Sequence, residues 1–376
     1  MLFELLYQHT HLYLLFSRLF ATSMATLISF CAAICLFPLY IALLRRFKVS
    51  SELAQPEQNV EPVMPAGILF MVIIWATCLI TVRFNSYVIS ALIIYTFFSI
   101  IGAVDDIAKV VNKKRVVQGK ITKQDYQYKA DGISSNLRLT LYLLISLGVA
   151  MLAYKYIPNI NGQITVPFFK HLPYLHIWIF IPFMALVIAV MANGVNFTDG
   201  FDTLATVPLI TCALFVGIIA YISSNTRWCA YLLLPHIPNV EEVLPLIGAV
   251  IGTLLAYMWF NAPPSTIIMG DSGSVGLGGM IGLLFIFIKA EFFLPIVGFI
   301  IMLEFASVIL QIGYFKISHG KRIFRMAPIH HHFQILMRSN PVYRNDFLIR
   351  SKIAWRFHII SIIMLVVGLI LFLKVR

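Results

Sequence analysis

Long apolar runs, separated by short polar or charged breaks, dominate the chain of 376 residues. A membrane-spanning helix needs about 20 mostly apolar residues, and ten runs approach or reach that length. The pattern predicts an all-α, polytopic membrane protein of about ten transmembrane helices, with residues 23–376 as one membrane-embedded domain. The predicted spans are Ser23–Leu44, Gly67–Val82, Tyr87–Val104, Leu139–Tyr154, Ile177–Met191, Leu204–Ser223, Leu244–Phe260, Val275–Ile288, Phe293–Phe315 and Ala354–Leu373.

The composition agrees with this interpretation. Hydrophobic residues make up 60% of the chain and charged residues 12%, and the mean hydropathy is +0.88. A water-soluble domain could not bury so much apolar surface in one core. Residues 1–22 are also apolar, but they carry Glu4, His9, His11 and Arg18 and lack the basic start and cleavage site of a signal peptide. We expect an N-terminal extension there, such as an interfacial helix.

Lysine and arginine concentrate in alternate loops. With the N-terminus outside, the loops after the first, third, fifth, seventh and ninth spans hold 20 of the 28 basic residues. Cytoplasmic loops carry such an excess, so we expect both termini on the periplasmic side. The net charge of +12 then indicates anionic lipid headgroups and anionic substrates as partners, and no nucleic acid is required.

Two polar clusters fall in these cytoplasmic regions. In VDDIAK, Asp105 and Asp106 stand at the predicted end of the third span, with Lys109 one turn later. Such a pair can simply end a span in headgroup water, or it can ligate Mg²⁺ or take a proton. The second cluster is NGVNFTDGFDTLA, residues 193–205, whose polar residues recur every third position and would share one side of a broken helix. Those residues are Asn193, Asn196, Asp199 and Asp202, and helix capping would account only for the last.

The third cluster runs from Asn261 to IIMGDSGS. GDSG surrounds the nucleophilic serine of chymotrypsin-like proteases, but that chemistry needs a double β-barrel and a His and an Asp brought to the serine. No such scaffold is present, so Ser272 is expected to be a bystander. Asp271 begins an apolar helix on the cytoplasmic side, where free N–H groups can hold phosphate. The glycines that follow are expected to allow close helix packing.

The fourth cluster is HGKRIFRMAPIHHHF, with His330, His331 and His332. Three adjacent imidazoles cannot all bind one ion, and among basic residues they favour anion binding. Gln311 and Glu304 are polar residues within the ninth span, which usually indicates a partner or a site. Five aspartates and many cations on one side are typical of Mg²⁺-assisted phosphoryl transfer.

Five ordered motifs resemble those of the phospho-N-acetylmuramoyl-pentapeptide transferases of bacterial cell-wall synthesis, which belong to the polyprenyl-phosphate N-acetylhexosamine-1-phosphate transferases. The motifs are VDDIAK, NGVNFTDGFDTLA, WFNAPPSTIIMGDSGSVGLGG, EFASVILQIGYFK and GKRIFRMAPIHHHF. The APIHHHF form resembles the muramoyl-pentapeptide branch more than relatives that use UDP-N-acetylglucosamine. The resemblance implies a multi-pass protein of the bacterial inner membrane, with ten spans, periplasmic termini and a cytoplasmic active site.

The resemblance also implies a reaction. Phospho-MurNAc-pentapeptide would pass from UDP-MurNAc-pentapeptide to undecaprenyl phosphate, giving lipid I and UMP, either directly or through an aspartyl-phosphate. Asp271, with Asp199, would hold Mg²⁺, and Asp105 would activate the lipid phosphate beside Asp106. The implied substrate-binding residues are Lys109, Asn193, Asn196, Asp199, Asp202, Asn261, Gln311, His330, His331 and His332. A homodimer is a further expectation.

Two alternatives stay open at this point. One is a sister transferase acting on another UDP-N-acetylhexosamine. The other is a transporter or scaffold that binds polyprenyl phosphate without turnover, although five carboxylates gathered on one side argue against it. The chain departs from the family pattern at Asn136 and Arg138, where Arg and Lys are expected, at Gln334, where Glu is expected, and in EPVMPAGILF, where the family has a PTMGG region.

Overall fold

The computed structural model describes residues 13–47, 62–117, 134–166, 173–339 and 345–374, together with positions 7, 9 and 49. Most of the predicted extension, residues 118–133 of the segment between Lys109 and Arg138, and residues 340–344 lie outside the described residues. Within this part the regular structure is helical, and β contacts are limited to two isolated bridges, Val63–Ile267 and Gln163–Tyr174.

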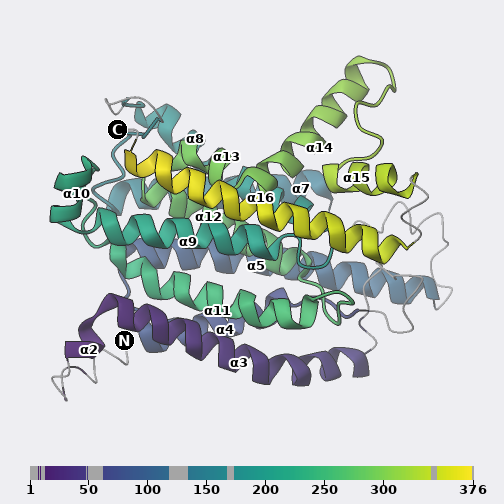
Figure 1. Cartoon of the computed structure of the whole chain (residues 1–376), viewed down its shortest axis with the longest axis horizontal. Helices are drawn as coiled ribbons and strands as arrows, with labels where there is room; N and C mark the ends of the chain where they lie inside the picture. The colour runs from purple at the N-terminus through teal and green to yellow at the C-terminus, as the bar shows by residue number, and fades with distance from the viewer. Residues whose placement is uncertain are drawn as a thin grey trace.

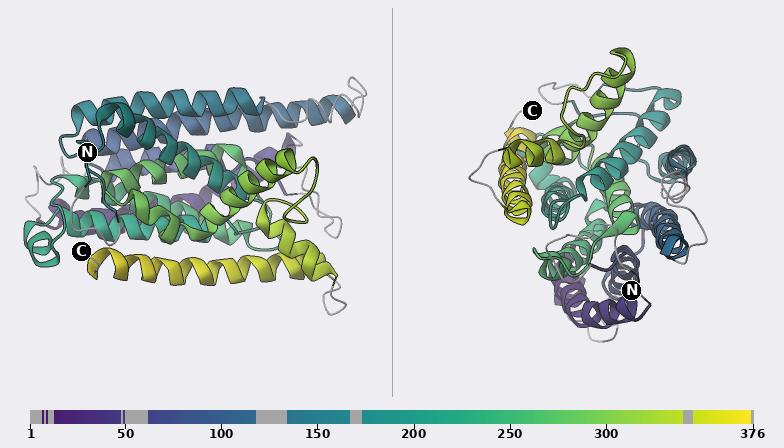
Figure 2. Two further views of the ribbon diagram at one scale, coloured as in Figure 1. Left: turned by 90° about the horizontal axis from the view of Figure 1, so that it is seen from above. Right: turned by 90° about the vertical axis from the view of Figure 1, so that its right-hand side faces the viewer.

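The described helices form one elongated bundle (Figures 1 and 2). Nine of them are long and apolar enough to cross a membrane, and α4 is a shorter apolar helix. The all-helical, polytopic membrane architecture is therefore confirmed. In chain order the helices are α2 (Tyr13–Phe16), α3 (Arg18–Arg46), α4 (Gly67–Thr81), α5 (Ser86–Val117), α7 (Ser135–Tyr156), α8 (Ile177–Thr198), α9 (Thr206–Ser223), α10 (Thr226–Leu232), η1 (Val240–Val243), α11 (Leu244–Asn261), α12 (Gly270–Phe287), η2 (Glu291–Phe293), α13 (Leu294–Val297), α14 (Phe299–Ile317), α15 (Ile329–Arg338) and α16 (Asp346–Lys374).

The two ends of the described chain share one end of the bundle. Helix α2, helix α10 and the C-terminal end of α16 lie there, and α15 lies at the opposite end (Figure 1). Helix α14 projects away from the other helices toward α15 (Figure 1). That the shared end is periplasmic remains a prediction.

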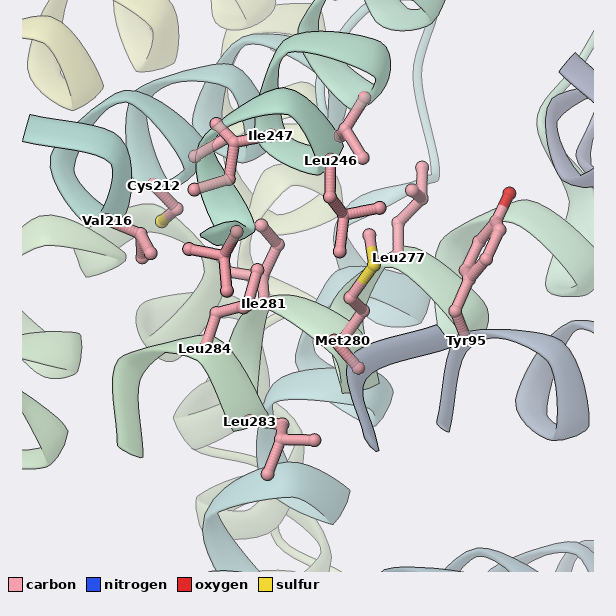
Figure 3. Packing of buried hydrophobic residues seen from close by; sticks show 14 of the residues in the cluster. Tyr95, Cys212, Val216, Leu246, Ile247, Leu277, Met280, Ile281, Leu283 and Leu284 are labelled. Atoms are coloured by element: carbon pink, nitrogen blue, oxygen red, sulfur yellow. The ribbon is translucent and has the colours of Figure 1, made fainter. Parts of the chain in front are cut away.

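Helix α12 is the centre of the bundle. Every one of its residues except Asp271 is buried, and its apolar side chains pack against those of neighbouring helices such as α9 and α11 (Figure 3). Glycines bring the backbones together: a Cβ on Gly278 would lie 2.8 Å from the carbonyl oxygen of Met191 in α8. Close packing is thus what this glycine-rich stretch provides.

Several predicted boundaries were wrong, for example at the end of α8, which continues to Thr198. Helix α5 continues to Val117, so Asp105 and Asp106 lie inside it, because both carboxylates have partners there that replace water. The predicted ninth span is broken at Gly298, between α13 and α14. Helix α3 begins at Arg18, earlier than the predicted start, because Ser17 caps it: the Ser17 hydroxyl accepts the main-chain N–H of Phe20.

Candidate functional site

The N-terminal end of α12 is held by acidic side chains from other helices. The main-chain N–H groups of Asp271 and Ser272 donate to the two carboxylate oxygens of Asp106, each at 3.0 Å. The preceding N–H, that of Gly270, is hydrogen-bonded to Asp199, at the C-terminal end of α8. The first N–H groups of a helix have no partner within it and carry partial positive charge. The carboxyl groups of Asp106, in α5, and Asp199, at the end of α8, therefore cap α12 and fix the position of Asp271.

Glycines make this approach possible. A Cβ on Gly102 of α5 would lie 2.5 Å from the carbonyl carbon of Asp271. Gly270 has φ +75°, and a Cβ there would lie 2.7 Å from a carboxylate oxygen of Asp106. Side chains at either position would separate α5 from the start of α12.

Two cations bridge the carboxylates of Asp105 and Asp271. Arg138 Nη1 lies 2.8 Å from Asp105 Oδ2 and 2.7 Å from Asp271 Oδ2. Lys109 Nζ contacts the same two oxygens at 2.8 and 3.1 Å. Asp105 is fully buried, whereas the Lys109 and Arg138 side chains are about a quarter exposed. The cluster therefore presents positive charge at the surface and negative charge beneath it.

The other oxygen of Asp271 faces α8. Asn196 Nδ2 donates to Asp271 Oδ1 at 2.9 Å and also contacts Ser274 Oγ at 3.1 Å. Asn193 lies on the same helix, but its amide donates to the Ala189 carbonyl oxygen. Burial, together with the negative charges of Asp271 and Asp106, raises the pKa of the Asp199 carboxyl well above its usual range.

The turn after α8 is braced by Asn261. Its Oδ1 accepts from the Thr203 N–H at 2.7 Å, and its Nδ2 donates to the Ile267 carbonyl oxygen at 2.8 Å. The two polar groups of this amide thus connect the loop after α8, which carries Asp202, with the segment just before α12, the helix that carries Asp271. Asp202 does not cap the next helix, since α9 begins at Thr206 with Ala205 at its N-cap.

The three histidines have different surroundings. His330 is buried, with Nδ1 3.1 Å from Glu304 Oε2, and its ring lies close to Gly200 and edge-to-face with Phe201. His331 is half-buried and contacts Gln334. His332 accepts from the Arg325 N–H through Nδ1. The triplet therefore does not present three equivalent side chains.

A cavity of about 530 Å³ lies between α14 and the segment before α15. Gln311 is part of its wall, and the Gln311 Oε1 also accepts from the Phe324 N–H at 2.9 Å. The wall combines apolar and basic side chains. It is formed by Val308, Gln311, Ile312, Phe315, Lys316, Arg322, Met326 and Ala327.

The donor set fits Mg²⁺ better than a transition metal. Among the described residues, no three His, Cys, Asp or Glu side chains are arranged to hold a metal by themselves. Mg²⁺ seldom needs such a cage, because it is usually bound by one or two carboxylates plus water and substrate phosphates. Asp271 supplies a carboxylate whose Oδ2 already attracts two cationic groups, so the residues present fit this ion.

Comparison with known proteins identifies the family. Residues 88–289 match the family described as glycosyl transferase family 4. A phospho-N-acetylmuramoyl-pentapeptide-transferase of Solidesulfovibrio magneticus is 37% identical over 88% of this chain and 87% of its own length. Proteins with the same name from Rickettsia felis and Campylobacter jejuni are 35% and 37% identical over 98% and 82% of this chain, and over 98% and 85% of their own lengths.

The chain belongs to the phospho-N-acetylmuramoyl-pentapeptide-transferase family. It is accordingly a phosphotransferase enzyme of the membrane, and the resemblance seen in its motifs is confirmed. In this family member the structure brings Asp105, Asp106, Lys109, Asn196, Asp199 and Asp271 together at the start of α12. Of the remaining predicted residues, Asn193 lies on α8, and the others lie on the loop after α8, at the end of α11, and on α14 and α15.

Sequence reasoning missed Arg138 as a site residue. Its signal was present, because Arg138 stands where the family has a basic residue, at the start of the fourth span. Only the fold shows that this position reaches both Asp105 and Asp271. Glu304 was noticed as a polar residue in a span, and its partner is His330.

Proposed function

We propose that this enzyme transfers phospho-MurNAc-pentapeptide from UDP-MurNAc-pentapeptide to undecaprenyl phosphate, giving lipid I and UMP in peptidoglycan synthesis. The observation that carries the proposal is the convergence of Lys109 and Arg138 on Asp105 and Asp271, in a chain of this family. Phosphoryl transfer between two anionic substrates depends on positioned positive charge. The cluster supplies that charge at the membrane boundary.

In this proposal Asp271 and Asp199 would hold Mg²⁺. The ion would neutralise the diphosphate of the nucleotide substrate and stabilise the charge that develops on it. Asp106 would not share this task, because both of its oxygens accept main-chain N–H groups of α12. Its contribution is to hold Asp271 in place.

Lys109 and Arg138 would bind phosphate oxygens. Both side chains are about a quarter exposed above the buried Asp105, so a phosphate can reach their positive charge from the surface. Asp105, beneath them, is the candidate to accept a proton from the lipid phosphate. A phosphate oxygen of the lipid would then bond to the sugar-linked phosphorus as the bond to the UMP oxygen breaks.

The cavity beside α14 is the proposed place for the nucleotide-sugar. Its lining combines apolar side chains with Lys316, Arg322 and Gln311, which suits a ligand with a flat ring and negative charge. The lipid acceptor would approach from the bilayer between spans. The inner-membrane location, the cytoplasmic orientation of this face and the homodimer remain parts of the proposal.

Release of UMP by purified protein with Mg²⁺ and undecaprenyl phosphate tests the substrate assignment. Separate reactions would contain UDP-MurNAc-pentapeptide or UDP-N-acetylglucosamine. Release with the first alone supports lipid I synthesis. Release with the second alone would assign the chain to the sister reaction, and no release from folded protein that still binds undecaprenyl phosphate would favour a non-catalytic role.

A further inference from the structure

A chain of polar contacts links the middle histidine of the triplet to the start of α16. His331 Nδ1 lies 3.1 Å from Gln334 Oε1. Gln334 Nε2 lies 3.1 and 3.0 Å from the two carboxylate oxygens of Asp346. Asp346 in turn pairs with Arg338 and with Arg350. Gln334 is buried, so water cannot supply a hydrogen bond that its amide fails to make within the protein.

The orientation of the Gln334 amide follows from the chemistry of Asp346. Arg338 and Arg350 pair with this carboxylate and stabilise its ionised form, and an ionised carboxylate can only accept hydrogen bonds. The amide NH₂ must therefore face Asp346. Its carbonyl oxygen then faces His331 and can only accept, so the hydrogen of the imidazole must be on Nδ1.

The surroundings of His331 oppose a second hydrogen on the ring. The charged and titratable groups around it are His330 and Arg338 on α15, and Arg350 and Asp346 on α16. From the loop after α8 it meets the Phe201 ring, edge-to-face at 5.4 Å between centroids. Burial first, and the neighbouring His330 second, lower the pKa of His331. Asp346 is already neutralised by its arginines and is separated from His331 by the amide.

We propose that Gln334 is a positioning residue that fixes His331 as a neutral imidazole with its hydrogen on Nδ1, leaving Nε2 as a hydrogen-bond acceptor for an N–H or O–H group of the nucleotide-sugar substrate. Within the described part of the chain, Nε2 has no hydrogen-bond partner. The identity of the ligand rests on the proposed function, whereas the tautomer does not. A glutamate at this position would instead stabilise an imidazolium, which donates from both nitrogens. Gln334 thus decides whether His331 accepts or donates.

Histidine ¹⁵N NMR of the full-length protein in nanodiscs tests this directly. The His331 signals would be assigned by their loss in His331→Asn. Near neutral pH we expect a protonated Nδ1 and a bare Nε2. In Gln334→Glu we expect the His331 titration midpoint to rise by about one unit or more, because a carboxylate replaces the amide. Gln163→Glu, at the opposite end near Lys289, is the control and should leave these signals unchanged.

A hydrogen on Nε2, an imidazolium near neutral pH, or an unmoved midpoint in Gln334→Glu would overturn the proposal. Should Gln334→Glu fail to fold, the double variant Gln334→Glu/Asp346→Asn keeps a donor–acceptor pair across α15 and α16 and should show the same raised midpoint.

Kinetics then separate this inference from the proposed function. In UMP release, Gln334→Glu should raise KM for the nucleotide-sugar at least tenfold near neutral pH, with a smaller change in kcat, and should shift the acid limb of the kcat/KM profile to higher pH. An unchanged KM and pH profile would contradict the acceptor role. Absence of UMP release from every variant and from the parent would contradict the proposed function instead, and the NMR result would stand independently.

Discussion

Asp106 accepts the main-chain N–H of Asp271 at 3.0 Å, although the two residues lie on different helices. Its second oxygen accepts the N–H of Ser272. The neighbouring Asp105 instead faces Lys109 and Arg138. Two adjacent acids in VDDIAK therefore do different work: Asp106 holds the helix that carries Asp271, and Asp105 lies beneath the cations that face the substrates.

Replacing Asp106 should cost stability as well as activity. In Asp106→Ala two buried N–H groups at the start of α12 lose their acceptor, and we expect a loss of about 1–3 kcal/mol in unfolding free energy. Asp106→Asn retains one acceptor and should lose less. Thermal unfolding in detergent measures both. An Asp106→Ala protein as stable as the parent would show that the cap is not needed.

Arg138 should control the response of the protein to Mg²⁺. In Arg138→Met the buried Asp105 loses the guanidinium that lies 2.8 Å from its Oδ2, so the metal-free protein should be less stable by about 1–3 kcal/mol. Because a competing cation is gone from Asp271 as well, added Mg²⁺ should raise the melting temperature more than in the parent. Arg138→Lys, the matched control, should respond as the parent does. Identical Mg²⁺ responses in all three proteins would contradict this competition.

Gly102→Ala should disrupt the contact between α5 and α12. The added Cβ would lie 2.5 Å from the backbone of Asp271, and such overpacking costs about 1–3 kcal/mol. Gly148→Ala in α7 is the control, because a Cβ there meets nothing within 4 Å. We expect lower thermal stability and turnover only in the first variant. Equal effects of the two substitutions would remove the argument for close approach.

Asp199 should make the metal-free protein less stable as pH rises. Its pKa is raised above the ordinary value of 3.8, so the folded protein binds this proton more tightly than the unfolded chain does. The resulting stability is present at low pH and is lost as pH rises through the raised pKa. Asp199→Asn has no such proton. The melting temperature of the parent in a chelator, relative to Asp199→Asn, should therefore fall as pH rises above the ordinary carboxyl value of 3.8, and parallel curves would contradict the raised pKa.

Much of the fold followed from the sequence because a bilayer leaves few choices. Apolar runs of sufficient length must be helices, and each predicted span corresponds to a described helix or, in the ninth, to a broken one. The ends were less predictable. Asp105 and Asp106 looked like a helix end because isolated acids belong in water, and only the fold supplies the N–H groups and cations that keep them inside α5.

The site was predictable where a motif is local and unpredictable where it depends on a contact. Asp271 and Asn196 were named from their motifs, and the structure places them 2.9 Å apart. Arg138 required the fold, since it lies 33 positions after Asp105, on another helix. The bracing role of Asn261 was equally hidden, because a sequence does not show that both ends of its amide meet main-chain groups.

The most direct test of the central claim is Mg²⁺-dependent formation of the lipid-linked product from UDP-MurNAc-pentapeptide and undecaprenyl phosphate by Asp271→Asn. Ser272→Ala is the control, because it keeps the main-chain N–H that Asp106 accepts. We predict that Asp271→Asn stays folded and loses at least about 10³-fold in turnover, while Ser272→Ala retains most of it. A folded Asp271→Asn protein with the turnover of the parent would contradict the account.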